Sequence, residues 1–209
     1  MFTFYKETNL EQWISSMLLE NRIFTPADLY DLECIAEAFD VKLLFSDSPS
    51  FSDNELRVIF IDKRASDARA RTVFFHELCH VLRHAGDQRY MPELFEQAQE
   101  FEAEAFVLYA TMPFYMFSQL ELPDRKWDAL HLVSETFNVT LDLAEQRLEQ
   151  IYRREMNGSL AAERRSQELT NHRKNRQPTW SPETQRILKQ LNRQLLAKGM
   201  PGYRDKGLL

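Results

Sequence analysis

Two histidines four residues apart, with a glutamate beside the first, form the pattern in this sequence that is best suited to chemistry. They are His76, Glu77 and His80, in the pentapeptide "HELCH". In a helix, residues four apart project side by side, so both imidazoles would face one metal ion. Glu77 lies about 100° from His76 around the helix, where its carboxylate can reach a water at the metal without replacing a ligand. This arrangement is typical of zinc peptidases, with the glutamate as general base.

A third ligand is available on a second predicted helix. The segment "EFEAEAFVLYATMP" carries Glu100, Glu102 and Glu104 among apolar residues. Glu100 and Glu104 share a helix face, whereas Glu102 points about 200° away from Glu100. We therefore expect Glu100 to bind the metal and Glu104 to bond the second ring nitrogen of a ligand histidine. Glu102 is predicted to lie exposed to solvent.

Three further residues are candidates for supporting roles. His84 lies one turn beyond His80, but four protein ligands would leave no position for water, so we interpret His84 as structural or as a partner of a ligand. His131, in "WDALHLV", and Tyr109 are candidates for stabilising the oxyanion. The alternative for His131 is a hydrogen bond to a neighbouring residue.

Hydrophobic periodicity predicts an α+β fold, in which a small sheet packs on several helices. A cap at Thr25 and a first-turn proline at Pro26 indicate the start of the second helix. A loop rich in Ser, Asp and Pro separates the two predicted strands. The predicted helices are 9–21, the one from Thr25 to Phe39, 67–85, 92–111, 124–137 and 140–155, and the predicted strands are 41–45 and 56–61.

Charge divides the chain into an acidic body and a basic tail. From residue 153 to the end there are 13 Lys and Arg against 5 Asp and Glu, and the preceding residues carry 13 against 27. Helical periodicity stops near Asn157 and Gly158, so we predict a domain at 1–156 and a tail at 157–209.

The tail is predicted to hold a polar linker of about twenty residues and then an amphipathic helix, which Ser181 caps and Gly199 ends. That helix could dock on its own domain, pair with another chain, or bind a partner protein or DNA. Of these, we expect a docking element for protein.

Composition excludes several classes of protein. The longest uncharged apolar run, 106–117, is far short of the roughly 20 residues that a membrane span requires. The first residues lack the pattern of a secretory signal, so we expect a cytoplasmic protein. Cys34 and Cys79 both fall in predicted helices and are expected to be reduced and buried.

The sequence also resembles a known family. The stretch "VIFIDKRASDARARTVFFHELCHVLRH", followed by "EFEAEAFVLYATMP" and "FNVTLDLAEQRL", is similar to the ImmA/IrrE metallopeptidases of bacteria and their mobile elements, over about residues 55–150. The resemblance implies a zincin-like domain that holds Zn²⁺, with Glu100 as the third ligand, thirteen residues before Pro113. It also implies a helix-turn-helix repressor, encoded nearby, as the substrate. The family usually has Asn or Asp where this chain has Glu104, and Gly or Ala at Cys79.

We therefore predict a cytoplasmic zinc endopeptidase that hydrolyses a transcriptional repressor or a similar regulator. The alternative is a non-hydrolytic anti-repressor, or a DNA-binding or protein-binding regulator, with the same fold. The segment "HLVSETFNVTLDLAEQRL" has the rhythm of a DNA-reading unit. Its second helix, however, carries Asp142, Glu145 and Glu149, which would repel phosphate, so DNA binding is expected only through the basic tail. The sequence leaves the oligomeric state open.

Overall fold

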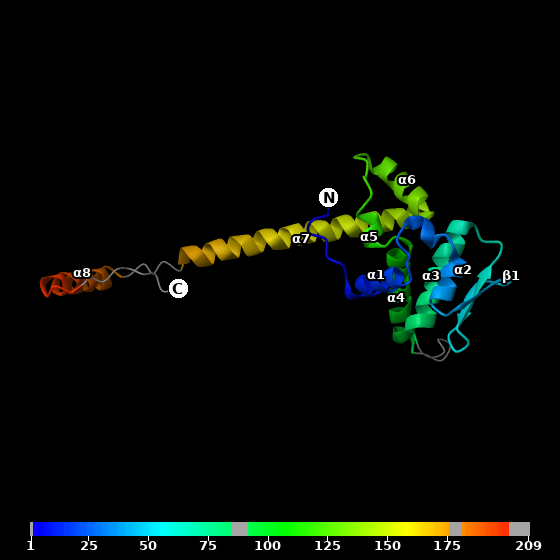
Figure 1. The fold of residues 1–209 in the computed structure, drawn as a ribbon, viewed down its shortest axis with the longest axis horizontal. Helices are drawn as coiled ribbons and strands as arrows, with labels where there is room; N and C mark the ends of the chain where they lie inside the picture. The colour runs from blue at the N-terminus through cyan, green and yellow to red at the C-terminus, as the bar shows by residue number, and fades with distance from the viewer. Residues whose placement is uncertain (1, 85–91, 176–180, 201–209) are drawn as a thin grey trace. The chain divides into compact units, whose positions relative to one another are not determined.

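The computed structural model describes residues 2–84, 92–175 and 181–200. The chain divides into two compact units, Met1–Gly158 and Ser159–Leu209. The first unit combines helices with a three-stranded sheet, which confirms the predicted α+β class (Figure 1). The elements are α1 (Asn9–Glu20), the 3₁₀ helix η1 (Pro26–Leu29), α2 (Leu32–Ala38), β1 (Lys42–Ser46), β2 (Phe51–Asp53), β3 (Val58–Asp62), α3 (Asp67–Arg83), α4 (Glu93–Thr111), α5 (Phe114–Phe117), α6 (Lys126–Phe137), α7 (Leu141–Asn175) and α8 (Pro182–Ala197).

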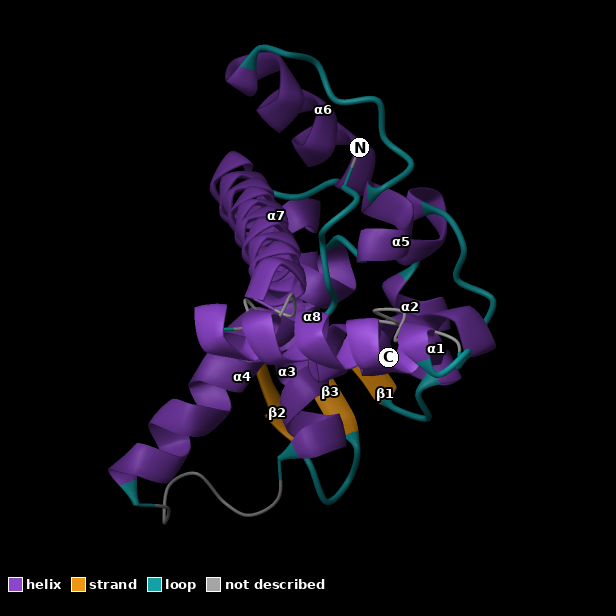
Figure 2. Cartoon of the chain, turned by 90° about the vertical axis from the view of Figure 1, so that its left-hand side faces the viewer, coloured by secondary structure: helices purple, strands orange, loops and turns teal. Residues whose placement is uncertain are grey.

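The sheet is a small platform for α3. Figure 2 shows its three strands side by side, with β3 between β1 and β2. β1 runs parallel to β3, whereas β2 pairs with β3 in the antiparallel sense. Helix α3 packs on β2 and β3 and also against α4, which in turn contacts α1. The helix that carries the two histidines is therefore held between the sheet and a second helix.

Burial explains why α3 takes this central place. Phe74, Phe75, Leu78 and Cys79 are all fully buried within the helix, and Ile59 of β3 is fully buried in the sheet against which it packs. Removing side chains of this size from water stabilises the fold by roughly 1.5 to 3 kcal/mol each. The apolar faces of α3 thus fix the rotation of the helix, and with it the direction in which its histidines project.

The predicted helix after Thr25 is wrong in one respect, because the structure has two elements there. Residues Pro26–Leu29 form only a 3₁₀ turn, and α2 starts anew at Leu32. The Asp31 side chain accepts a hydrogen bond from the backbone N–H of Cys34 and so caps α2. This cap lies in the middle of the apolar pattern that predicted one helix, and it separates the 3₁₀ turn from α2.

The loop predicted between the two strands is also wrong in part, because it contains β2. The ring of Phe51 stacks on the ring of Phe60 in the neighbouring strand, with centroids 4.5 Å apart. A strand of three residues is too short to show the alternation by which strands are recognised in a sequence. The helix α5 was not predicted either, because its four residues are too few to show helical periodicity.

Helix α7 continues beyond the predicted end at residue 155, through Gly158, as far as Asn175. A Cβ on Gly158 would lie 2.2 Å from the carbonyl oxygen of Phe4, so only glycine fits where the N-terminal segment crosses the helix. The backbone N–H of Phe4 donates to Glu155 one turn earlier, at 2.8 Å. Gly158 is therefore a packing position, and residues 160–165 are good helix formers that continue the helix.

Helix α8 is confirmed in the second unit. The Ser181 hydroxyl accepts from the N–H of Thr184, Pro182 occupies the first turn, and Gly199 follows the helix with φ +70°. No residue of α8 is buried, and Ile187 and Leu196 are each more than half exposed. The predicted linker of about twenty residues is mostly the end of α7, and the remainder, 176–180, lies outside the described residues.

The two cysteines differ from each other. Cys79 is buried as predicted, and burial raises the pKa of its thiol to about 12, so the thiol stays protonated. The prediction that Cys34 is buried is wrong, because it lies exposed on the outer side of the short helix α2. Among the described residues, no helix combines the length and the apolar character that a bilayer span requires.

Candidate metal centre

Helices α3 and α4 bring the three predicted ligands together. The Nε2 atoms of His76 and His80 lie 3.1 Å apart. The two carboxylate oxygens of Glu100 lie 3.4 Å from these nitrogens, one from each. His80 is 6% exposed, whereas His76 and Glu100 are partly exposed, so the group opens to solvent on one side. Their role as ligands stays a prediction.

The group fits zinc in geometry and in chemistry. Bonds of about 2.0 to 2.2 Å in a tetrahedron place ligand atoms about 3.3 to 3.6 Å apart, within about 0.2 Å of the three separations found. Burial, and then the neighbouring His76 ring, lowers the pKa of His80 to about 4. Its imidazole is therefore neutral near neutral pH, which is the form that binds a metal. Two imidazoles and one carboxylate are a typical donor set of catalytic zinc sites.

A chain of hydrogen bonds orients the ring of His80. His80 Nδ1 lies 2.8 Å from Nδ1 of His84, and Nε2 of His84 lies 3.3 Å from the Glu102 carboxylate. Burial alone would raise the Glu102 pKa, but hydrogen bonds from Arg83 and His84 outweigh it and lower the pKa, so the carboxylate is ionised and can only accept. His84 can then donate from Nε2 to Glu102 and accept at Nδ1 from His80. In this arrangement His80 donates from Nδ1 and keeps its Nε2 lone pair for a metal.

This chain corrects the prediction for Glu102, which was expected to be an exposed residue. Its side chain is one-third exposed and is engaged by Arg83, at 2.6 Å, as well as by His84. Glu104 is the exposed one, and the second nitrogen of His80 is bonded by His84 instead. The helical wheel of α4 alone could not show that the end of α3 reaches the side of α4 where Glu102 lies. The one residue in the sequence that could have indicated this contact is His84, because its ring is buried in the structure and needs a hydrogen-bond acceptor.

We expect the purified protein to hold about one zinc ion per chain, and His80→Ala to lose it, because this substitution removes a buried ligand. Metal analysis after gel filtration measures the zinc content. His131→Ala is a matched control, since His131 lies on α6 with its ring against Trp127, at a centroid distance of 4.7 Å. Full zinc occupancy in His80→Ala would contradict the assignment.

A pocket of about 740 Å³ lies beside the candidate ligands. His76 and Glu77 contribute to it from α3, Glu104 from α4, and Gln150 from α7. Most of the remaining lining is apolar, and it comprises Thr72, Val73, Phe101, Ala105, Val107, Leu108, Leu143 and Gln146. A volume of this size is sufficient for several side chains of a peptide. The predicted general base therefore faces a space that a substrate can occupy.

Two polar residues at this site, Ser52 and Gln150, were not predicted from the sequence. Ser52 donates from Oγ to Glu77 Oε2 at 2.6 Å, across from β2 to α3. Gln150 is held at the pocket wall, because its amide oxygen accepts from Arg147 and its amide nitrogen donates to the Tyr109 hydroxyl at 3.2 Å. Neither residue type nor spacing singles them out in the sequence, since both meet the site only through tertiary contacts.

Neither oxyanion candidate is among the residues that line the pocket beside the candidate ligands. Tyr109 is 5% exposed, and its hydroxyl accepts from Gln150 and Arg154. His131 lies on α6 against Trp127. Tyr109 thus bonds to Gln150 of the pocket wall, and the roles proposed for Tyr109 and His131 stay predictions.

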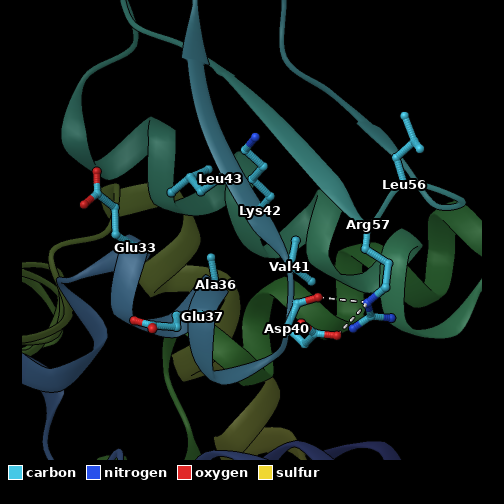
Figure 3. Close-up of a pocket in the computed structure, with 9 residues that line it drawn as sticks. All are labelled: Glu33, Ala36, Glu37, Asp40, Val41, Lys42, Leu43, Leu56 and Arg57. Atoms are coloured by element: carbon cyan, nitrogen blue, oxygen red, sulfur yellow. Dashed lines mark hydrogen bonds and ion pairs between the residues drawn. The ribbon is translucent and has the colours of Figure 1, made fainter.

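A second pocket, of about 680 Å³, lies between α2 and β1 (Figure 3). Its Arg57 guanidinium donates to the carbonyl oxygens of Phe39 and Asp40 and pairs with the Asp40 carboxylate at 3.8 Å. Asp40 and Arg57 both have positive φ, 53° and 52°, at the ends of the adjoining turns. These contacts close the connection from α2 to β1, so Asp40 and Arg57 of this pocket have a structural role.

Comparisons with known proteins show the family to which the chain is similar. The profile of the IrrE N-terminal-like domain (Peptidase M78) matches residues 28–149, more than half of the chain. The "Phage-like element PBSX protein XkdA" of Bacillus subtilis (strain 168) is 32% identical over 150 residues, covering 70% of this chain and 75% of that protein. "Uncharacterized protein YqaB" of the same organism is 30% identical over 152 residues, covering 72% and 88%.

The fold is similar to that of a solved structure. A "Mycobacterium tuberculosis transcriptional regulator" superposes with a TM-score of 0.52 at 15% identity, and the match covers 67% of this chain but only 46% of that one. At this identity the similarity concerns the fold alone. Fold and candidate ligands together are of the zincin-like metallopeptidase type. The chain belongs to the IrrE N-terminal-like family, Peptidase M78, and so has a regulatory role of the metallopeptidase type.

Proposed function

We propose that the protein is a zinc-dependent endopeptidase that cleaves a regulatory protein, in particular a helix-turn-helix repressor. One observation carries the proposal: the nitrogens of His76 and His80 and the carboxylate of Glu100 converge at tetrahedral spacing beside a pocket that Glu77 lines. A structural zinc site would use a fourth protein ligand. Among the described residues the group consists of three side chains, and three ligands beside a pocket are typical of a catalytic site.

Each side chain then has a defined task. A zinc ion held by these ligands supplies a Lewis acid that polarises a peptide carbonyl and makes water more acidic. Glu77 accepts the proton of the attacking water and passes it to the amine that leaves, so its carboxylate returns to the ionised state. The chain from Glu102 through His84 keeps the His80 ring in the orientation and tautomer that ligation requires.

The family and its relatives support a regulator as the substrate. The phage-element name of one relative favours control of genes on a mobile element. The pocket is lined mainly by apolar side chains, which suit apolar residues of a protein segment that is exposed or can unfold locally.

Cleavage of a regulator encoded beside this protein's gene would test the proposal. The zinc-loaded chain and the metal-free chain are each incubated with that regulator, and mass spectrometry identifies the fragments. We expect one cut that requires zinc. If the regulator is instead bound and released from DNA intact, the protein is the non-hydrolytic anti-repressor, and the peptidase proposal is wrong.

We propose that α8 binds a protein partner. Its apolar residues Ile187, Leu191 and Leu196 are exposed, on a helix that also carries basic side chains.

Deleting residues 159–209 tests this proposal and keeps Gly158 and its contact with Phe4. The remaining 1–158 should fold, hold zinc and cleave a short peptide as the full chain does. Its kcat/KM for the intact regulator should fall by about 10-fold or more, since the second binding site is lost. An insoluble or zinc-free truncated protein would show that the tail belongs to the core.

A further inference from the structure

Strand β2 brings one hydroxyl group to the carboxylate of Glu77. Ser52 Oγ donates to Glu77 Oε2 at 2.6 Å, a short distance for a hydrogen bond between two oxygens. Since a serine hydroxyl has one hydrogen, this bond takes up the whole donor capacity of the Ser52 side chain. Both side chains are partly buried, so the contact is sheltered from much of the solvent.

The sheet fixes Ser52 in this position. Ser52 pairs with Ile59 of β3, between the pairs Phe51 with Phe60 and Asp53 with Val58. The stacked rings of Phe51 and Phe60, only 13° from parallel, hold this register. Successive residues of a strand point to opposite faces, so a shift by one residue would turn Ser52 away from α3.

Both ends of the short strand are anchored as well. At its start, the Ser50 hydroxyl accepts from the backbone N–H of Asp62 at 2.9 Å. At its end, the Asp53 carboxylate accepts from the N–H of Leu56 and closes the turn into β3. Ser52 is therefore a rigid point on the sheet, whereas Glu77 has three rotatable side-chain bonds and needs such a point to keep one rotamer.

We propose that Ser52 is a positioning residue for Glu77: its hydroxyl holds one carboxylate oxygen in place, which leaves the other oxygen for the proton of the attacking water. The inference rests on the proposed peptidase function. It gives Ser52 of β2 a role in placing the general base, and that role follows from the position of its hydroxyl beside the Glu77 carboxylate. Ser52 does not touch the reacting atoms and acts only through the rotamer of Glu77.

Three serine variants test this role in the zinc-loaded full chain. The probe is an internally quenched peptide, chosen from a random decapeptide library because the wild-type protein cleaves it. Ser52→Ala should lower kcat by about 10-fold, with KM, zinc content and Tm close to wild type, because only the placement of the base is lost. Ser52→Thr keeps the hydroxyl on a residue that suits a strand, and should retain kcat to within about 3-fold. Ser48→Ala, which removes an exposed hydroxyl in the loop before β2, should leave kcat unchanged.

Crystal structures of the zinc-loaded wild type and of Ser52→Ala provide a readout that is independent of cleavage. We expect one Glu77 rotamer in the wild type, and a displaced or multiple one in the variant. A Glu77 carboxylate in the same place in both structures, an unchanged kcat, or a loss of zinc in Ser52→Ala would overturn the inference. If the wild type cleaves no peptide in the library, the peptidase proposal fails, while the two Glu77 positions still decide whether Ser52 holds this carboxylate.

Discussion

Glu77→Gln is expected to give a folded, zinc-loaded protein that cleaves its substrate about 10² to 10⁴ times more slowly. Glutamine has nearly the same volume as glutamate, and its amide oxygen can still accept from Ser52, so the packing around α3 is retained. The amide cannot take a proton from water at neutral pH. The measurements are kcat on a confirmed substrate, the zinc content and the melting temperature.

Glu104→Gln is the matched comparison, because Glu104 lines the same pocket from α4 and is exposed. We expect it to alter kcat far less than Glu77→Gln does. If the order is reversed, so that Glu104→Gln stops cleavage and Glu77→Gln does not, then Glu104 is the general base and the role of Glu77 is wrong.

Glu11→Gln is expected to lower the free energy of unfolding by about 3 to 5 kcal/mol. Glu11 is 1% exposed, and its carboxylate pairs with Arg147, which is fully buried, at 2.9 Å and also with Arg154. The Tyr5 hydroxyl donates to the same carboxylate. Because these contacts join α1 to α7, removing the one negative charge leaves the buried guanidinium of Arg147 without its counter-ion. For a chain of this length, Tm should fall by about 10 °C or more.

Glu20→Gln is the control, since Glu20 is exposed at the far end of α1 and should change stability by less than about 0.5 kcal/mol. Chemical denaturation of the three proteins gives the free energies. Equal stability of Glu11→Gln and Glu20→Gln would show that this cluster contributes nothing to the fold.

The Glu11 cluster also has a definite pH dependence. Burial alone would raise the Glu11 pKa, but Arg147, hydrogen bonds from Tyr5 and Thr8, and Arg154 outweigh it and hold the pKa below its usual value of 4.5. The folded state therefore binds this proton less tightly than the unfolded state. The stability that ionised Glu11 contributes is fully present above pH 4.5, and it is lost as the pH falls through the lower pKa of the folded protein. Below pH 4.5, the unfolding free energy should decline more steeply for the wild type than for Glu11→Gln.

The long elements and the candidate ligands could be predicted from the sequence, because they depend on helical periodicity. His76 and His80 share a face of any helix that contains them, and Glu100 follows from the next apolar helix. Helices α1, α3, α4 and α6 begin and end within about two residues of the prediction, which is the usual uncertainty of helix ends. The predicted family resemblance, from about residue 55 to 150, is confirmed by a profile match that starts earlier, at residue 28.

The predictions of secondary structure were wrong where a local sequence pattern is too short, or where a contact with a distant part of the chain overrides it. Three residues of β2 show no period, and Asp31 divides an apolar pattern that looked continuous. Gly158 resembles a helix end in the sequence, yet it lies inside α7, because the backbone of Phe4 passes where a Cβ would be. In the last case, the reason for the glycine is more than 150 residues away along the chain.

The sequence by itself determined which residues are candidates to bind a metal, since the positions of side chains one turn apart follow from the backbone of a helix. Only the tertiary structure decided what surrounds them. Ser52 meets Glu77 through the register of β2 on β3, and Glu102 meets His84 because α4 lies along α3. Such contacts depend on how elements pack against one another, and the free energy of that packing is spread over the whole buried core.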